Sequence, residues 1–160
     1  MKKNPKSKIQ NPQSLTHVDS RGNVRMVDVG AKPPMRREAI AQGEFIAAKK
    51  TLDLLISAKL PKGEGLAAAR LAGILAAKRC DELIPLCHTL PLDSVAIDFK
   101  RIAPTKLRIT AAATITAKTG VEMEALTAVA VAALTLYDMC KAVDKSMRIE
   151  CIRLISKIKR

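Results

Sequence analysis

A long stretch without glycine or proline begins after Gly120 and runs to the end of the apolar region near Lys145. Its apolar residues recur every three to four positions, which is the spacing of one helix face. That face consists of Leu126, Val129, Ala130, Ala133, Leu134, Tyr137 and Cys140. The opposite side is nearly as apolar, so we expect the helix to be covered all round, in part by a second subunit. The chain is therefore expected to form a homo-oligomer.

Charged residues stand only at the two ends of this helix. Glu122 and Glu124 lie in the first turn, where the helix dipole favours anions. Asp138 and Lys141 are three residues apart in the last turns and share a face. On an ordinary helix the two glutamates would only interact favourably with the helix dipole, and Asp138 and Lys141 would form a solvated ion pair. Here they follow an apolar face, so we expect partial burial, and a partly desolvated carboxylate beside an amine favours acid–base chemistry.

Length and composition indicate one folded domain with a basic arm. The chain has 160 residues, of which 48% are hydrophobic and only 2% aromatic, so its core must be aliphatic. Residues 1–14 are polar, basic and interrupted by proline, and we expect them to be disordered. Residues 15–160 form the domain. The net charge of +13 favours an anionic partner, such as a phosphate ester or a nucleic acid.

The cysteines indicate a reducing compartment. There are four of them, none in a Cys-x-x-Cys pair, and no signal peptide precedes them. We therefore expect free thiols in a soluble cytoplasmic protein. Cys80, Cys87 and His88 do not have the spacing of a zinc site, so no metal centre is predicted. No uncharged apolar run reaches membrane-spanning length, so no membrane association is expected.

The remaining elements follow from hydrophobic periodicity and from glycine and proline punctuation. The expected strands are 24–30, 36–45, 95–99, 107–116 and 147–158, and the expected helices are 46–60, 66–79 and the long one after Gly120. Pro85 and Pro91 exclude a regular helix from residues 81–92. The small residues of the helix at 66–79, with Gly73 in its interior, allow close packing against another backbone, and residues 103–105 turn the chain between two strands of alternating apolar and polar residues. This order predicts an α+β sandwich of the ferredoxin-like kind, with helices packed on one face of an antiparallel sheet.

Five motifs in the right order resemble the MoaC family, the cyclic pyranopterin monophosphate synthases of molybdenum cofactor biosynthesis. They are Met26-Val-Asp-Val, Ala72-Gly-Ile with Ala76-Ala-Lys-Arg, Leu83-Ile-Pro-Leu-Cys-His, Gly120-Val-Glu-Met-Glu-Ala-Leu-Thr, and Tyr137-Asp-Met-Cys-Lys-Ala. The resemblance covers nearly the whole chain, from Leu15 to Lys157. It implies a hexamer built as a trimer of dimers, with active sites at the subunit interfaces.

The resemblance also implies a reaction. The substrate would be 3′,8-cyclo-7,8-dihydroguanosine 5′-triphosphate, which is rearranged to cyclic pyranopterin monophosphate with release of pyrophosphate. This is phosphorus–oxygen lyase chemistry. It implies no resident cofactor, although Mg²⁺ can accompany the triphosphate.

The family's functional residues map onto matching positions of this chain. Asp138 and Lys141 correspond to the catalytic acid–base pair. The substrate-binding positions are Leu86, Cys87, His88, Glu122, Met123, Glu124, Lys62 and Lys157, with Arg37 and Lys78 as further basic candidates. The physical chemistry is compatible, because carboxylates accept hydrogen bonds from a guanine-like edge and lysines neutralise phosphates. The chain departs from the family pattern at His88-Thr89, where we expect His-Pro, and at its short C-terminus.

Two other kinds of function are compatible with the composition. A basic ferredoxin-like sheet could bind RNA through backbone phosphates, but the hairpin strands offer only Phe99 for base stacking. RNA binding that survives Asp138→Asn would support that reading, whereas the enzyme reading expects no nucleic-acid partner. A non-catalytic oligomeric scaffold would respond to changes at Asp138 or Lys141 only in stability.

Overall fold

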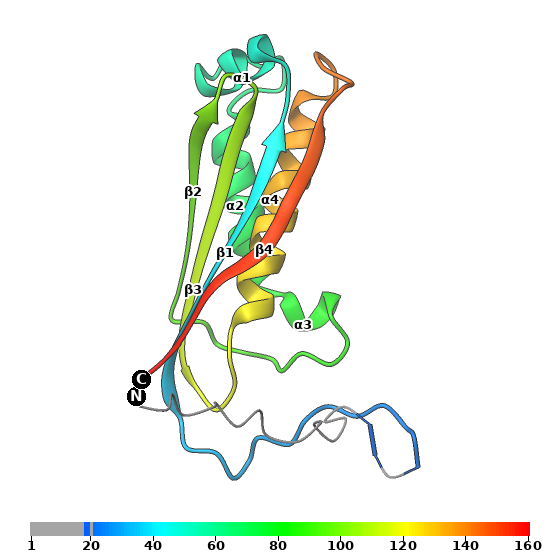
Figure 1. The fold of residues 1–160 in the computed structure, drawn as a ribbon, viewed down its shortest axis with the longest axis vertical. Coiled ribbons are helices and arrows are strands. Elements are labelled where there is room, and N and C mark those ends of the chain that lie inside the picture. Colours follow the sequence, from blue (N-terminus) through cyan, green and yellow to red (C-terminus); the bar gives the residue numbers. More distant parts are fainter. Residues whose placement is uncertain (1–17, 20) are drawn as a thin grey trace, which may run out of the picture.

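The computed structural model describes residues 18, 19 and 21–160, so the predicted arm at residues 1–14 lies outside the described residues. The elements in chain order are β1 (Met35–Ile46), α1 (Lys49–Ile56), α2 (Gly65–Lys78), α3 (Cys80–Leu83), β2 (Ser94–Ala103), β3 (Lys106–Ala117), α4 (Glu122–Cys140) and β4 (Arg148–Lys159). Figure 1 shows long strands in front and the two long helices, α2 and α4, behind them.

The four strands form one antiparallel sheet in the order β2-β3-β1-β4. This order and the helix crossovers are those of the predicted ferredoxin-like α+β fold. The hairpin turns at Pro104 and Thr105, as the sequence predicts. Strand β4 lies at an edge and pairs with β1 through two register shifts, and Cys151, in the second irregular stretch, has a φ of 55°.

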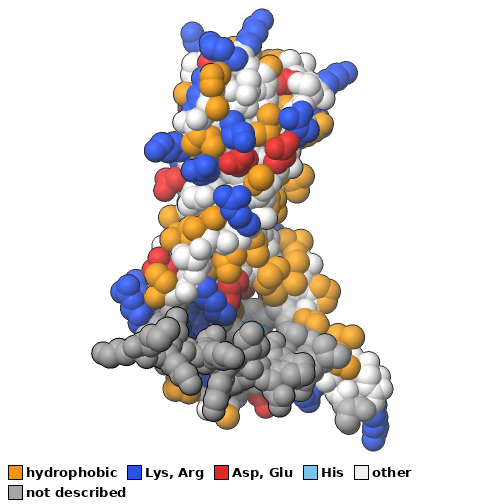
Figure 2. All heavy atoms as spheres, viewed as in Figure 1, with side chains coloured by type: hydrophobic (Ala, Val, Ile, Leu, Met, Phe, Trp, Pro, Cys, Tyr) orange, Lys and Arg blue, Asp and Glu red, His pale blue; other side chains and the backbone are white. Residues whose placement is uncertain are grey.

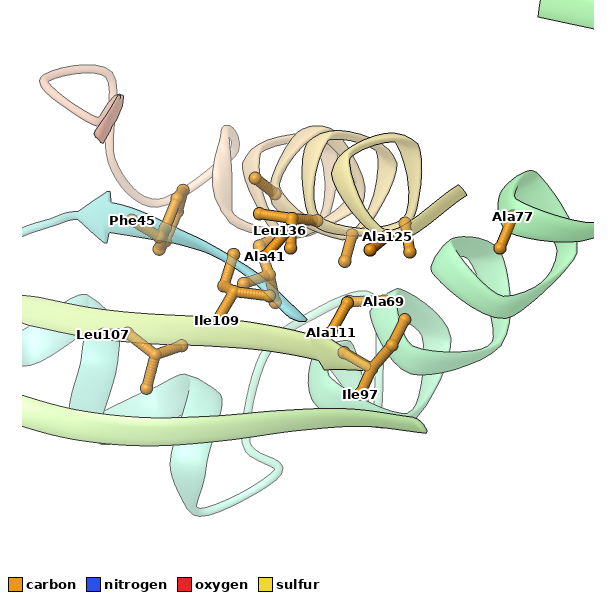
Figure 3. Packing of buried hydrophobic residues seen from close by; sticks show 14 of the residues in the cluster. Ala41, Phe45, Ala69, Ala77, Ile97, Leu107, Ile109, Ala111, Ala125 and Leu136 are labelled. Atoms are coloured by element: carbon orange, nitrogen blue, oxygen red, sulfur yellow. The ribbon is translucent and has the colours of Figure 1, made fainter. Parts of the chain in front are cut away.

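The core lies between the sheet and the helices (Figure 3). In β3 the predicted alternation is confirmed, because every second side chain from Leu107 to Ile115 is at most 1% exposed. These side chains meet an apolar face of α4 that includes Ala125, Val129 and Leu136, all fully buried. The low aromatic content does not prevent a closed core, since small alanines let the backbones come close together.

Helix α2 packs closely against α4, and Gly73 makes this possible. A Cβ atom at this position would lie 2.4 Å from Ile97 Cδ1 and 2.7 Å from the backbone oxygen of Ala128. Such distances are too short for real contacts, so only glycine lets the two helices approach this closely while α2 also covers β2. This agrees with the small-residue packing predicted for the helix at 66–79.

One face of α4 is left open within a single chain. Leu134 and Tyr137 were expected in the core stripe, but their exposed fractions are 60% and 37%. Met123, on the same side of the helix, is 38% exposed. By length and composition α4 could span a membrane, yet half of its apolar window is buried against the sheet and α2, as in the core helix of a globular domain. The expectation that its own chain covers only part of this helix is thus confirmed: within the named face Val129 and Cys140 are buried, whereas Leu134 and Tyr137 are exposed.

Three expected elements need correction. Residues 24–30 do not form a strand: only Val24 pairs, in an isolated bridge with Val18, and the rest of the segment crosses the end of the domain. The helix expected at 46–60 is limited to α1. The short helix α3 occupies the start of the 81–92 segment, because Pro85 restricts only the residues close to it.

Candidate active site

A pocket of about 390 Å³ opens at the end of the sheet where α4 begins. Six predicted substrate-binding residues line it: Leu86, Cys87, His88, Glu122, Met123 and Glu124. The first three come from the irregular segment after α3, and the last three from the first turn of α4. The structure therefore brings together two segments that are far apart in the sequence.

Gly120 allows the first turn of α4 to form this wall. A Cβ atom at Gly120 would lie 1.9 Å from Glu122 Oε2, so the carboxylate rests against a backbone that has no side chain there. Lys157 on β4 forms an ion pair with the same carboxylate. Lys157 is thus placed beside the pocket, next to Glu122, as the resemblance implies for a substrate-binding lysine.

Glu124 is the buried carboxylate of the pocket, with an exposed fraction of 3%. Burial raises the pKa of Glu124, and the nearby charges of Glu122 and Asp81 raise it further. Burial also raises the pKa of the Cys87 thiol. The pocket therefore combines one carboxylate that is paired with a lysine and one that is poorly solvated, a combination that favours hydrogen bonds to the N–H groups of a bound ring.

The segment Val27–Lys32 crosses the mouth of the pocket and contributes Val27, Val29 and Lys32 to its lining. The segment is tied to the domain at two points. The His88 Nε2 atom lies 2.9 Å from the Val27 oxygen, and Lys118 Nζ donates to the Gly30 oxygen at 2.6 Å. Sequence reasoning missed Lys32 as a site residue. The available signal was the Met26-Val-Asp-Val motif, which we had interpreted as part of a strand.

A second cluster lies at the opposite end of α4 and consists of Lys62, Asp138 and Lys141; we call it the aspartate–lysine cluster. Lys141 Nζ lies 2.7 Å from Asp138 Oδ1, and Lys62 Nζ lies 2.7 Å from Asp138 Oδ2. Lys62 also donates to the backbone oxygen of Asp138 at 2.9 Å. Three residues assigned to the active site by resemblance are therefore in direct contact.

The cluster is open to solvent in the single chain, which contradicts the expected partial burial. The side chains of Asp138 and Lys141 are 54% and 56% exposed. Hydrogen bonds from Lys141 and then Lys62 lower the pKa of Asp138 to about 2, and Asp138 in turn raises the pKa of Lys141. At neutral pH the isolated chain thus holds an ion pair. The error arises because the face of α4 that precedes the pair is itself uncovered.

The pocket and the aspartate–lysine cluster are too far apart to act together within one chain. At a helical rise of 1.5 Å per residue, Glu122 and Asp138 are separated by about 24 Å along α4. In Figure 1 the two ends of α4 lie at opposite ends of the molecule, one near α3 and the other near α1. Each chain therefore holds the predicted site residues in two separate groups, here called the two half-sites. Figure 2 shows lysine and arginine side chains at the α1 end of this face and others along its length.

The two further basic candidates, Arg37 and Lys78, do not line the pocket. Arg37 is buried and donates to the backbone oxygens of Ala117 and Lys118, each at 3.0 Å, so its guanidinium holds the strand end that leads to the pocket. Lys78 is exposed at the end of α2 and does not line the pocket. Thr89, where the chain departs from the family pattern, donates to Asp81 and so ties the His88 segment to α3.

Among the described residues, no group of three or more His, Cys, Asp or Glu side chains is arranged to hold a metal ion. All four cysteines are free. Cys80 and Cys140 are buried, and burial raises their pKa values to about 12 and about 11. These two thiols are therefore protonated core residues.

The sequence matches one family model, described as the MoaC family, over residues 26–159. Several curated relatives carry the name cyclic pyranopterin monophosphate synthase. A relative from Roseiflexus sp. (strain RS-1) is 56% identical over 144 residues, which are 89% of this chain and 91% of the relative. Relatives from Chloroflexus aurantiacus and Novosphingobium aromaticivorans are also 56% identical, again over 89% of this chain and over 88% and 90% of their own lengths. The matched region contains β1 to β4, the pocket and the aspartate–lysine cluster, and the chain therefore belongs to the MoaC family.

Proposed function

We propose that this protein is a cyclic pyranopterin monophosphate synthase of molybdenum cofactor biosynthesis. It would convert 3′,8-cyclo-7,8-dihydroguanosine 5′-triphosphate into cyclic pyranopterin monophosphate and release pyrophosphate, as a phosphorus–oxygen lyase of the cytoplasm. Support comes from relatives of that name that share more than half of their residues with the chain. Mg²⁺, where it takes part, would arrive with the triphosphate.

The observation that carries the mechanism is the separation of the two half-sites. A second copy, turned end to end across the open face of α4, would bring its aspartate–lysine cluster to the pocket of the first copy. Met123, Leu134 and Tyr137 supply exposed apolar surface for that contact. A two-fold arrangement of this kind makes two complete sites at once. Three such dimers would make the proposed hexamer.

In the completed site the pocket would hold the ring system. Glu122 and Glu124 would accept hydrogen bonds from the N–H groups of the guanine-derived edge, which is the reason for two carboxylates in one wall. Lys157 and Lys32 lie on the same side and would neutralise phosphate oxygens. Lys62 of the second copy would contact the departing pyrophosphate, where positive charge stabilises the developing negative charge.

Proton transfers would be carried out by Asp138 and Lys141. In the single chain the ion pair is solvated, and the pKa of Asp138 is too low for a base. Covering the cluster with the pocket of another copy would remove water from both groups. Desolvation disfavours the charged forms, so the pKa of Asp138 would rise and that of Lys141 would fall, each towards neutrality. Assembly would thereby turn an ordinary ion pair into an acid–base pair.

The test is turnover of the purified protein with the cyclised GTP intermediate, with pyrophosphate release and pyranopterin formation followed together. Asp138→Asn and Lys141→Ala should lose turnover by about a hundredfold or more while keeping the oligomer and melting temperature of the wild type. Lys100→Ala is the matched control, because it removes an exposed lysine of β2 that belongs neither to the pocket lining nor to the aspartate–lysine cluster, and its turnover should be unchanged. No product from correctly assembled wild type would refute the proposal.

RNA binding gains no support from the position of the two phenylalanines. Phe45 is fully buried, and Phe99 packs towards the helix side of the sheet, with the Arg70 guanidinium 5.4 Å from its ring centre. Neither ring is presented for base stacking.

A further inference from the structure

Asp144 lies in the turn after α4 and makes a dense set of contacts, although the resemblance assigns it no role. It is 8% exposed and accepts four hydrogen bonds. The donors are the backbone N–H of Ala48 at 2.8 Å, the Thr51 hydroxyl at 3.0 Å, and the backbone N–H and hydroxyl of Ser146 at 2.9 and 2.8 Å. Burial alone would raise the pKa of Asp144, but the hydrogen bonds outweigh it and lower the pKa to about 2.

Two of these bonds join the turn to the beginning of α1. Ala48 is the N-cap residue of α1 and makes no side-chain cap, and Asp144 accepts its backbone N–H from a distant part of the sequence, the bond that an N3 carboxylate makes in a capping box. The remaining two bonds, from Ser146, hold the turn itself in shape. The carboxylate therefore connects the end of α4 rigidly to α1.

The same two elements carry the aspartate–lysine cluster. Lys141 begins the turn, and its N–H donates to the Tyr137 oxygen at 2.9 Å, while the Asp144 N–H donates to the Cys140 oxygen at 3.1 Å. On the other side, α1 leads through buried Leu60 to the loop that bears Lys62. The side chain of Lys62 then contacts Asp138.

The contacts form a closed circuit: α4, the turn, Asp144, α1, the Lys62 loop and Asp138. Besides the apolar packing of Leu55 and Leu60 in the common core, two polar connections in it join segments distant in the sequence, the Asp144 carboxylate and the Lys62–Asp138 ion pair. An exposed ion pair stabilises little by itself, because solvent screens it and side-chain entropy opposes it. The buried carboxylate is thus the firmer of the two polar connections that keep the two lysines on either side of Asp138.

We propose that Asp144 is a positioning residue for the aspartate–lysine cluster, which holds Lys141 and Lys62 on Asp138 through the turn and α1. This inference rests on the proposed function for its effect on turnover, but not for its effect on the lysines. Misplacement of a reacting group by a fraction of a helical turn is costly, so loosening the circuit should slow the reaction.

The experiment compares Asp144→Asn, Thr51→Val and Ser146→Ala with wild type, all as assembled protein well below their melting temperatures. The first readout is trace acetylation with acetic anhydride, scored for each lysine by mass spectrometry without substrate. Loss of the close Asp138 contacts frees the amines of Lys141 and Lys62 from the hydrogen bonds that now occupy them, so the acetylation of both should become about threefold faster or more. Lys78, exposed at the end of α2, is the internal control.

The second readout is turnover against pH. In Asp144→Asn, kcat should fall about tenfold or more, and the basic limb of the rate profile should move to lower pH. Thr51→Val and Ser146→Ala, which each remove one hydroxyl donor, should show smaller changes of the same kind. They also provide the test if Asp144→Asn does not fold. Thr127→Val is the matched control, because it removes a buried hydroxyl of α4 that bonds Cys80 and is outside the circuit.

Faster acetylation of Lys62 and Lys141 in the circuit variants, but not in Thr127→Val, supports the positioning role even if wild type shows no turnover. That combined result would reject only the synthase assignment. Unchanged acetylation and an unchanged pH profile in folded circuit variants would overturn the inference and leave Asp144 as a helix cap. The same changes in Thr127→Val would also overturn it, because they would follow from general destabilisation.

Discussion

The separation of the two half-sites leads to a quantitative prediction for mixed oligomers. His88→Ala damages the pocket, and Asp138→Asn damages the aspartate–lysine cluster about 24 Å away along α4. Each variant alone should have no more than about one-hundredth of wild-type turnover, the usual loss for a group in proton transfer or substrate positioning. If every site combines the pocket of one chain with the cluster of another, the two defects can be separated by mixing.

The expected recovery follows from the two-fold arrangement. Random pairing of the two variants at equal amounts gives mixed dimers in about half of the cases. In a mixed dimer one site combines both defects and the other combines an intact pocket with an intact cluster. The mixture should therefore regain about a quarter of wild-type turnover for each chain present.

The assay is turnover after the two proteins are mixed, unfolded in urea and refolded together, with native mass spectrometry to confirm mixed oligomers. Asp138→Asn mixed with Lys141→Ala is the control, because both defects lie in the same cluster and no combination restores it. Absence of recovery from confirmed His88→Ala and Asp138→Asn mixtures would refute the shared site. Recovery in the control mixture would refute the assignment of Asp138 and Lys141 to one cluster.

Three further results are expected. Gly73→Ala should destabilise the fold by about 1–3 kcal/mol in urea unfolding, because the new methyl group must force α2 from α4; equal or greater stability would contradict the close packing. Gly120→Ala should raise KM with little change in melting temperature, since the Glu122 carboxylate must leave its place; an unchanged KM would mean that this placement is unnecessary. In the single chain the pKa of Asp138 is about 2 against an ordinary 3.8, so its pairing stabilises the unassembled chain above pH 3.8, and this stabilisation is lost as pH falls through 2. At protein concentrations low enough to dissociate the oligomer, the urea midpoint of wild type should fall more steeply across that window than that of Asp138→Asn, and parallel curves would contradict the sign of the shift.

Much of the fold could be predicted from local patterns, because each pattern has one dominant physical cause. The alternation from Leu107 to Ile115 requires one face on a core and the other towards water, which only a strand satisfies. Glycine within the helix at 66–79 predicted close helix contact, and Gly73 provides it. The segment at 24–30 is also apolar and bounded by glycine, but only Val24 pairs, with Val18, and Val27 and Val29 line the pocket instead.

The site was less predictable, because its geometry depends on contacts between distant parts of the chain and on a second copy. Periodicity shows that α4 is apolar all round but cannot tell which side its own sheet covers, so Tyr137 and Asp138 were expected to be more buried than they are. The long-range contacts of Asp144 could not be predicted, since its partners Ala48 and Thr51 lie 96 and 93 residues away. Lys32, which lines the pocket from the segment Val27–Lys32, was not predicted for the same reason.

The length of α4 would constrain the geometry of the assembled protein. Because the helix carries a pocket residue at one end and a cluster residue at the other, its length would set the spacing between the two sites of a dimer. Insertion of one residue between Glu122 and Asp138 would lengthen the helix by about 1.5 Å and rotate Asp138 by about 100° around the axis. Both sites of the dimer would then lose register together. Relatives should therefore vary in the loops at either end of the domain and keep the residue count between these two positions constant.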